Sequence, residues 1–290
     1  MPAAICGTLI SVPWLPELFS APVLQQFLDK RRRDKLVAVP YFDGLMAGDP
    51  APLVESFAGE PEVHDPMHGR IKGVAEFTAF VTETSAWLRQ HRASVEDVDH
   101  VILERRGSEE VVLHLDTDNG TLGVPIVVVA DRRLDGRIDE LRIYFSSQPL
   151  TGRRATRPPL LQADPGPPPS GAVGAYVHAF AGGDVAAIVA AFDSEGYLRD
   201  AEGRQHSREG PDGVSDYYQR LFSTGGGIPM ETCALVDDGR NCVLEYNVGG
   251  WGATRLPPRA GAGASVRGHG GRLAAVRLYD DTIPPVGRDA

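Results

Sequence analysis

The 290-residue chain has few cysteines, and the three it contains, Cys6, Cys233 and Cys242, are too few for a disulfide framework. Such scarcity is typical of proteins from a reducing compartment. No Cys-x-x-Cys pair or cysteine–histidine cluster has the spacing of a zinc site. The sequence therefore predicts a protein without structural disulfides, without a bound metal and without a cofactor.

Long apolar runs are also missing. No stretch of about 18 apolar residues is present, so the sequence predicts no membrane-spanning helix and no membrane partner. The first 22 residues are mildly apolar, but they lack a basic start and are interrupted by Pro13 and Pro16, unlike a secretory signal peptide. We therefore expect residues 1–33 to form an ordered N-terminal arm and the protein to be cytoplasmic.

Positive charge is in short supply. The chain has 29 Lys and Arg against 39 Asp and Glu, a formal net charge of −10. A nucleic-acid-binding face needs clustered cations that displace the counterions of the phosphates. The one basic run, residues 30–33, is expected to be a solvated helix turn. The composition therefore argues against a nucleic-acid partner.

The length suggests about two domains, because domains average roughly 150 residues. Residues 151–170 contain six prolines, which exclude a regular helix or a central strand. We expect this segment to be an extended linker. It would separate a first domain, residues 34–150, from a second domain, residues 171–290.

The two predicted domains repeat the same sequence features. Residues 41–50 are YFDGLMAGDP and residues 176–185 are YVHAFAGGDV, which places the two tyrosines 135 residues apart. The same offset relates GRIDELRIYF, residues 136–145, to GRLAAVRLYD, residues 271–280. This is an internal duplication, and its period is too long for a solenoid repeat. It predicts tandem domains of one fold.

Each half contains the pattern of three helices followed by strands that alternate with hairpin signals. In the first half the longest helix is expected over residues 73–92, with Val74, Phe77, Val81 and Leu88 on one apolar stripe. We therefore predict an α+β fold of two cone-shaped barrel domains, each with three helices on a curved antiparallel sheet. Packing the two sheet backs together would make an intramolecular pseudo-dimer, in a protein that is a monomer or a homodimer.

One stretch of the second half departs from this pattern. Residues 252–271, GATRLPPRAGAGASVRGHGG, are rich in Gly, Pro and Arg where the first half has an apolar strand. They lack the lysine and the strand-to-helix context of a phosphate-binding loop. We expect a long, mobile hairpin over the second cavity.

The Tyr…Gly-Asp helix, the Phe-Ala stretch after it and the final Gly-[Lys/Arg]-Ile…Tyr strand resemble the nuclear transport factor 2-like superfamily, and within it the SnoaL-like branch. The resemblance covers residues 34–150 and 170–285. It implies a fold related to those of ketosteroid isomerase and polyketide cyclase. Because this superfamily contains isomerases, cyclases, dehydratases, epoxide hydrolases and plain binding domains, the fold alone does not define the reaction.

The resemblance to ketosteroid isomerase implies a tyrosine on the first helix and an aspartate base in the following short strand. Tyr41 and Asp65 match these positions, and Tyr176 and Asp200 are their counterparts in the second half. An aspartate in an apolar cavity becomes a better base, and a tyrosine hydroxyl can donate to a developing enolate oxygen. The third part of that isomerase site, a protonated aspartate on a late strand, has no counterpart in residues 121–130 or 256–270.

The resemblance to SnoaL-like cyclases adds a histidine that assists the aspartate. Candidates for ligand contact are two histidines beside Asp65, a strand histidine, a glutamate that would take its place in the second half, and two tryptophans for which core packing is the alternative: His64, His68, His114, Glu245, Trp87 and Trp251.

These features predict cofactor-independent proton transfer, of the isomerase, cyclase or dehydratase type, on a hydrophobic carbonyl or polyketide-like small molecule. Two alternatives stay open. One is a non-catalytic domain pair that binds a hydrophobic ligand. The other is an epoxide hydrolase or epoxide-opening cyclase, in which Asp65 would need a second acid such as Glu76 or Glu83.

Overall fold

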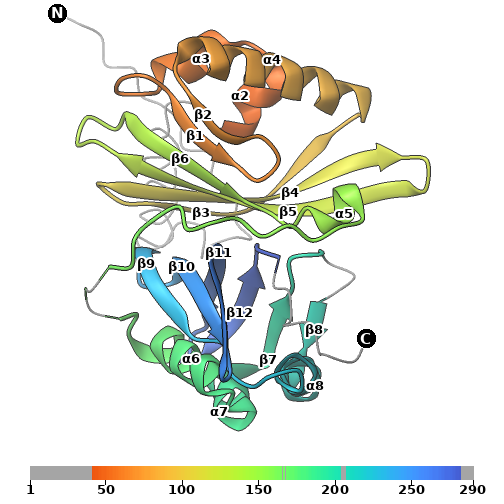
Figure 1. The fold of residues 1–290 in the computed structure, drawn as a ribbon, viewed down its shortest axis with the longest axis vertical. Helices are drawn as coiled ribbons and strands as arrows, with labels where there is room; N and C mark the ends of the chain where they lie inside the picture. The colour runs from red at the N-terminus through yellow and green to blue at the C-terminus, as the bar shows by residue number, and fades with distance from the viewer. Residues whose placement is uncertain (1–40, 165, 167, 204–206, 282–290) are drawn as a thin grey trace, which may run out of the picture. The chain divides into compact units, whose positions relative to one another are not determined.

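The computed structural model describes residues 41–164, 166, 168–203 and 207–281, all of them within one compact unit (Figure 1). The predicted N-terminal arm, the start of the first predicted helix and Cys6 lie outside these described residues. Among the described cysteines, Cys233 and Cys242 are free and buried.

Each half of the described chain has three helices and six strands. The first half contains α2 (Tyr41–Ala47), α3 (Pro50–Glu55), β1 (Glu62–Asp65), β2 (Gly69–Lys72), α4 (Val74–Gln90), β3 (Ser94–Ile102), β4 (Arg106–Thr117), β5 (Gly120–Arg132) and β6 (Ile138–Tyr144). The second contains α6 (Gly171–Gly182), α7 (Val185–Ala191), β7 (Phe192–Arg199), β8 (Ser207–Glu209), α8 (Gly210–Phe222), β9 (Met230–Asp237), β10 (Asn241–Trp251), β11 (Thr254–Arg267) and β12 (Leu273–Leu278). A short helix, α5 (Gln148–Thr151), begins the connection between them.

The two sheets have the same topology. Their strand orders are β2-β1-β6-β5-β4-β3 and β8-β7-β12-β11-β10-β9. The register repeats as well, because Glu110 pairs with Val127 in the first sheet and Glu245 pairs with Ala262 in the second, which is an offset of 135 at both positions. The predicted fold class, two tandem α+β domains, is therefore confirmed.

The repeated Gly-Asp is a corner between two helices. Gly48 and Gly183 have φ angles of 73° and 71°, a left-handed conformation that suits glycine. The next residue, Asp49 or Asp184, caps the following helix by accepting a hydrogen bond from a backbone N–H at 3.0 or 2.9 Å. The repeated motif is therefore explained by chain geometry alone.

Helices α2, α3 and α4 cover one face of the first sheet, as Figure 1 shows. α4 buries Phe77, Phe80, Val81, Ser85 and Leu88, a spacing of three and four residues that places them on one face. The sequence-based stripe was wrong at its first member, because the side chain of Val74 is 50% exposed at the helix start.

The predicted mobile hairpin at residues 252–271 is also wrong. Residues 254–267 form a regular strand, β11, that pairs with both β10 and β12. Its small residues alternate, so that the alanines face one side and the glycines the other. Ala260, Ala262 and Ala264 join the apolar cluster between the two sheets. A Cβ atom on Gly261 would come within 2.4 Å of the Tyr246 ring, so this glycine makes room for an aromatic side chain.

The backs of the two sheets pack together through one apolar cluster. It includes Val127, Val129 and Tyr144 from the first half and Val243, Ala262, Ala264 and Tyr279 from the second. Burial of this cluster removes both sheet backs from water, which is the main driving force for joining the halves.

Two buried ion pairs cross this contact in a reciprocal manner. Arg142 donates to both carboxylate oxygens of Glu245, at 2.6 and 3.0 Å, and Arg277 donates to both oxygens of Glu110, at 2.8 Å each. Each pair joins opposite halves, and their members are related by the 135-residue offset. The contact between the halves thus has the pseudo-two-fold symmetry of a homodimer interface, although both halves belong to one chain.

Tyr144 and Tyr279 complete the two ion pairs. The Tyr144 hydroxyl donates to Glu245 at 2.7 Å, and the Tyr279 hydroxyl donates to Glu110. A guanidinium covers each tyrosine ring, with Arg199 at 5.2 Å from the ring centroid of Tyr279 and Arg157 at 4.9 Å from that of Tyr144. Because Arg157 comes from the predicted linker, this segment is also part of the contact between the halves.

We predict that Glu245→Gln lowers the free energy of unfolding by about 2 kcal/mol, because the buried Arg142 loses its bidentate partner and keeps only the partly exposed Asp131 and Glu140. Asp139→Asn is the matched control, since it breaks an exposed pair with Arg133 that is worth about 1 kcal/mol or less. Urea unfolding followed by circular dichroism measures both variants. Equal losses for the two variants would contradict the assigned role of the buried pair.

Candidate functional site

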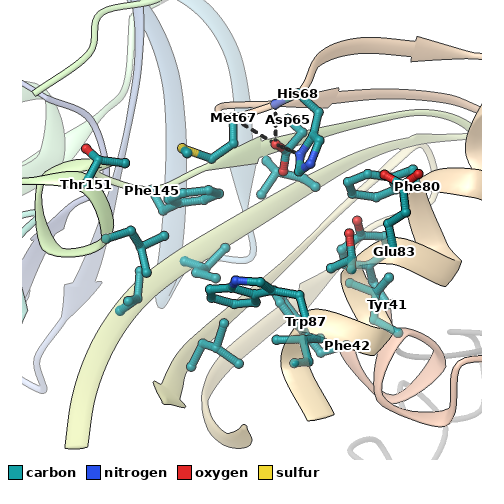
Figure 2. Close-up of a pocket in the computed structure, with 18 residues that line it drawn as sticks. Tyr41, Phe42, Asp65, Met67, His68, Phe80, Glu83, Trp87, Phe145 and Thr151 are labelled. Atoms are coloured by element: carbon teal, nitrogen blue, oxygen red, sulfur yellow. Dashed lines mark hydrogen bonds and ion pairs between the residues drawn. The ribbon is translucent and has the colours of Figure 1, made fainter. Parts of the chain in front are cut away.

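A pocket of about 520 Å³ opens in the first domain, between α2, α4 and the sheet (Figure 2). Its walls are mainly apolar and include Phe42, Phe80, Leu113, Ile126 and Phe145. This volume suits a small organic ligand, and an apolar wall with few polar groups is the usual composition of such sites. The polar lining side chains are Tyr41, Asp65, His68, Glu83, Thr84 and Thr151.

Asp65 and His68 form a pair on the β1–β2 hairpin. One carboxylate oxygen of Asp65, Oδ1, accepts hydrogen bonds from the backbone N–H groups of Met67 and His68 and from Nδ1 of the His68 ring, at 2.8 to 2.9 Å. The other oxygen, Oδ2, has no hydrogen-bond partner among the described residues. The turn thus holds the carboxylate of Asp65, a residue that is 6% exposed, in one orientation. Its Oδ2 remains able to accept a proton or a hydrogen bond.

His68 is oriented by the same hydrogen bond. A ring that donates from Nδ1 carries its free lone pair, when neutral, on Nε2. The hydrogen bond to Asp65 is the main cause of a raised pKa of His68, and partial burial opposes it. The ring also contacts Phe80 edge to face at 5.2 Å. Asp65 and His68 can therefore share a proton at the edge of the pocket.

Tyr41 supplies a hydroxyl without a partner. The side chain is buried on α2, and its Oη forms no hydrogen bond with any described residue. Burial raises the pKa of Tyr41 well above its usual value, and the negative charges of Asp65 and Glu109 add to this effect. The hydroxyl therefore stays protonated, and it lacks the hydrogen-bond partner among the described residues that a buried donor normally has.

The second domain fills the corresponding space with aromatic rings. Tyr176, the counterpart of Tyr41, shares a hydrogen bond with the Tyr218 hydroxyl at 2.8 Å. Phe180, Phe192 and Phe222 pack around these two rings. Burial raises the pKa of Tyr176 beyond its usual value. Tyr176 is thus a satisfied core residue, unlike Tyr41.

Asp200 lies apart from Tyr176, in a more polar pocket of about 350 Å³ on the second domain. Its Oδ1 accepts the backbone N–H of Glu202 at 3.0 Å, a turn that repeats the one at Asp65. The structure therefore brings Tyr41 and Asp65 to one pocket, but does not place Tyr176 and Asp200 in a common one.

Of the other residues predicted to contact a ligand, some line the first-domain pocket and others lie outside it. His68 and Trp87 line the first-domain pocket. His64 lies 3.6 Å from the carboxylates of Glu62 and Glu140, outside the lining, and His114 bonds to Glu96 at 2.9 Å. Trp251 is fully buried in the second-domain core.

Glu245 requires a correction. The sequence-based alignment gave it the place of His114, but the register makes it the counterpart of Glu110. Its side chain is 2% exposed and bonded to Arg142, so it lies between the sheets and not in a ligand pocket. The error arose because the strands were aligned four residues out of register; an even shift keeps a side chain on the same face of the sheet but changes its neighbours.

Sequence reasoning missed several pocket residues. Thr84 lines the pocket with a buried Oγ1 that has no partner in the described structure, and Phe145 follows the last strand. Asp280, which occupies the place of Phe145 in the second half, is partly buried and lines a pocket there. The 135-residue offset could have identified this position, because it aligns the acid Asp280 with the aromatic Phe145 and so indicates that the two pockets differ there.

Two groups of described side chains bring three potential metal ligands within 4.8 Å of one another: Glu62, His64 and Glu140, and Asp97, His100 and Glu109. In the first group Glu62 already pairs with Arg70 and Lys72, and Glu140 pairs with Arg142. These internal cations neutralise that group.

Residues 173–276 match the family model of the SnoaL-like domain, so the second domain is a SnoaL-like domain. The first domain repeats its strand order and register, which makes the described chain a tandem pair of nuclear transport factor 2-like folds. A comparison with curated proteins finds none that matches the chain.

Solved structures similar to a single domain include the epoxide hydrolase/cyclase-like enzyme SalBIII, of pyran ring formation in the polyether salinomycin (19% identity, TM-score 0.32, 40% of this chain and 91% of that chain). A protein from Catenulispora acidiphila with a ketosteroid isomerase-like fold, in complex with trimethylamine, is 20% identical (TM-score 0.34, 41% and 90%). A SnoaL-like protein of unknown function from Burkholderia thailandensis is 13% identical (TM-score 0.31, 36% and 87%). Within the described residues, the helices are too short or too polar to cross a membrane.

We predict opposite stability effects at the two equivalent tyrosines. Tyr41→Phe removes a buried hydroxyl that no described residue bonds to, and should leave the free energy of unfolding unchanged or raise it by up to about 1 kcal/mol. Tyr176→Phe breaks the hydrogen bond to Tyr218 and should lower it by about 1 kcal/mol. Denaturant unfolding of both variants decides the matter. A loss at Tyr41 as large as that at Tyr176 would mean that the Tyr41 hydroxyl has an internal partner.

Proposed function

We propose that the first domain binds a hydrophobic small molecule with a carbonyl group and catalyses proton transfer at the carbon next to that carbonyl, without a cofactor. One observation carries the proposal: a hydrogen-bonded acid–base pair, Asp65 and His68, lines the same apolar pocket as Tyr41, whose hydroxyl has no partner among the described residues.

Each side chain has a role in this reaction. Asp65 Oδ2 removes a proton from the carbon, and the electrons of the broken C–H bond form an enolate. The Tyr41 hydroxyl donates a hydrogen bond to the enolate oxygen, where negative charge develops. Asp65, assisted by His68, then returns the proton to a different carbon. Alternatively, the enolate carbon attacks a second carbonyl of the same molecule to close a ring, and Asp65 gives its proton to the alkoxide that forms there.

The pocket wall favours this chemistry because it is mainly apolar. Leu113, Val124 and Ile126 project from the sheet, opposite the aromatic side chains of the helices. An enolate is stabilised more by a fixed hydroxyl in such surroundings than by the same hydroxyl in water. A ligand with an apolar skeleton would fill the remaining volume.

The same pocket supports a second candidate function, opening of an epoxide ring. Glu83 of α4 lines the pocket together with Asp65, so two acids face one cavity. One acid would protonate the epoxide oxygen while the other activates a water molecule or a substrate hydroxyl. The first function is preferred because it gives the Tyr41 hydroxyl and the Asp65–His68 pair defined roles.

We propose that the second domain completes the contact between the sheets and does not catalyse this reaction, because aromatic rings occupy its cone. A single chain would then be self-sufficient, as a monomer or within a homodimer.

The test follows exchange of α-protons for deuterium by NMR, for a panel of apolar aryl and cyclic ketones incubated with the protein in D₂O. We expect protein-dependent exchange that falls by about 10²-fold to 10⁴-fold in Asp65→Asn. Tyr41→Phe should reduce the rate by about 10²-fold, since one hydrogen-bond donor to the oxyanion is lost.

Asp43→Asn, a change at an exposed acid on the same helix as Tyr41, is the control and should leave the rate unaltered. Ketone binding with no exchange in the wild-type protein would indicate a binding domain instead. Exchange that survives in Asp65→Asn would refute the assignment of the base. Hydrolysis or cyclisation of an epoxide panel, dependent on both Asp65 and Glu83, would select the second candidate.

A further inference from the structure

One wall of the first-domain pocket is formed where the connection between the two halves begins. Phe145 directly follows β6, and Leu150 and Thr151 belong to α5; all three line the pocket. Figure 2 shows Phe145 and Thr151 on the side of the pocket away from Tyr41. A ligand whose carbonyl oxygen meets the Tyr41 hydroxyl would therefore extend its apolar part towards this wall.

The helix that supplies this wall cannot hold its own position. α5 contains four residues and buries none of their side chains. Helices shorter than about 12 residues are marginal on their own in water, because few internal hydrogen bonds offset the cost of ordering the backbone. A contact from outside α5 must therefore fix the wall.

Asp281, at the end of the second half, provides that contact. Its Oδ2 accepts the backbone N–H groups of Ser147 at 3.2 Å and of Ala155 at 2.8 Å, and the Ser147 hydroxyl lies 3.0 Å from the same oxygen. The Ser146 hydroxyl donates to the other oxygen, Oδ1. Because Ser147 precedes α5 and Ala155 follows it, one carboxylate ties together both ends of the α5 segment, residues 146–155.

These hydrogen bonds lie out of contact with water. Asp281, Ser146 and Ser147 are 6%, 0% and 4% exposed. Hydrogen bonds to a carboxylate are stronger than those between neutral groups, and a buried donor that loses its acceptor is costly. Without the carboxylate, the donors of the α5 segment would have to reach water, and the segment would have to move.

The repeat explains why this contact can be made only in one direction. Ser146 and Asp281 are equivalent residues, 135 positions apart, and they bond to each other. In a two-fold arrangement a residue meets its own equivalent only near the axis. Two aspartates there would repel each other, whereas a serine and an aspartate form a hydrogen bond. The second half thus supplies the acceptor and the first half the donors.

We propose that Asp281 is a positioning residue for the first-domain pocket: through this carboxylate the second domain fixes the α5 segment, and with it the wall that the apolar part of a ligand contacts. The second domain thereby takes part in ligand binding without touching the ligand. This role goes beyond the proposed proton transfer and rests on that proposal only for the choice of a ketone as the probe.

The first measurement needs no ligand. The backbone N–H groups of Thr151 and Gly152 donate to the carbonyls of Ser147 and Gln148 at 2.9 Å, and ¹H–¹⁵N NMR follows their hydrogen exchange in the full-length protein. We expect Asp281→Asn to speed the exchange of these two groups by about tenfold or more, because the α5 segment opens locally.

Asp237→Asn is the matched control. It makes the same substitution at a partly buried aspartate of the second domain, whose carboxylate bonds to Arg267 of the same domain at 2.7 Å. It should leave the exchange of the α5 segment unaltered.

The second measurement follows butyrophenone binding through the methyl signals of the full-length protein. In the wild type, the ketone should shift the signals of Leu150 as well as those of Leu113 and Ile126 on the sheet. In Asp281→Asn we expect the Leu150 shift to be lost, the two sheet shifts to remain, and the affinity to fall by about tenfold, because part of the apolar contact is lost. Ser146→Ala should show the same pattern more weakly, and it decides if Asp281→Asn fails to fold.

Unaltered exchange of the α5 segment in Asp281→Asn, or a Leu150 shift and a ketone affinity equal to those of the wild type, would overturn the proposal. Equal effects of Asp281→Asn and Asp237→Asn would overturn it too, since they would reflect a general loss of stability. Failure of the wild-type protein to bind the ketone would count against the proposed function alone, because hydrogen exchange tests the role of Asp281 without a ligand.

Discussion

The exchanged ion pairs, Arg142 with Glu245 and Arg277 with Glu110, are the constraint on which the rest of the structure depends. Each charge is buried, and its partner comes from the opposite half. Separating the halves would break both bidentate pairs and expose the apolar sheet backs to water, so the two sheets stabilise each other. Because the pairs occupy the sheet backs, the helix-covered faces do not contribute to the contact between the halves. The residues inside each cone could therefore change independently.

The two cones have used that freedom differently. The first keeps an apolar pocket in which the Tyr41 hydroxyl has no partner within the described part of the chain and Asp65 is oriented by the turn that carries His68. In the second, Tyr218 satisfies Tyr176 and the cone is packed with rings, while Gly261 opens a separate place for Asp280 beside Tyr246. Equivalent positions thus carry apolar chemistry in one half and polar chemistry in the other, with the backbone register unchanged.

The duplication and the fold class were predictable because they depend on periodicity, and the 135-residue offset holds from Tyr41 to the end of the last strand. The convergence of Asp65 with His68 was predictable from a short turn. The fate of Glu245 was not, since a buried charge becomes understandable only when its partner in the other half is known. The structure of residues 252–271 could not be predicted either, because a sequence of alternating Ala and Gly is typical of a loop. In the fold the alanines pack on the other sheet and Gly261 packs on Tyr246, and neither contact can be read from the sequence. The position of Asp280 could not be predicted for a similar reason: its contact with Tyr246 depends on Gly261, a glycine 19 positions earlier.

The central claim is that only the first cone receives an apolar carbonyl compound. Crystals of the wild-type protein soaked with 4-bromoacetophenone test it directly, because the anomalous scattering of bromine locates the bound ligand without the need for any substitution. The account predicts one bromine site within the pocket of the first domain, with the carbonyl oxygen within hydrogen-bond distance of the Tyr41 hydroxyl. A bromine site inside the aromatic cone of the second domain, or a carbonyl directed away from both Tyr41 and Asp65, would contradict it.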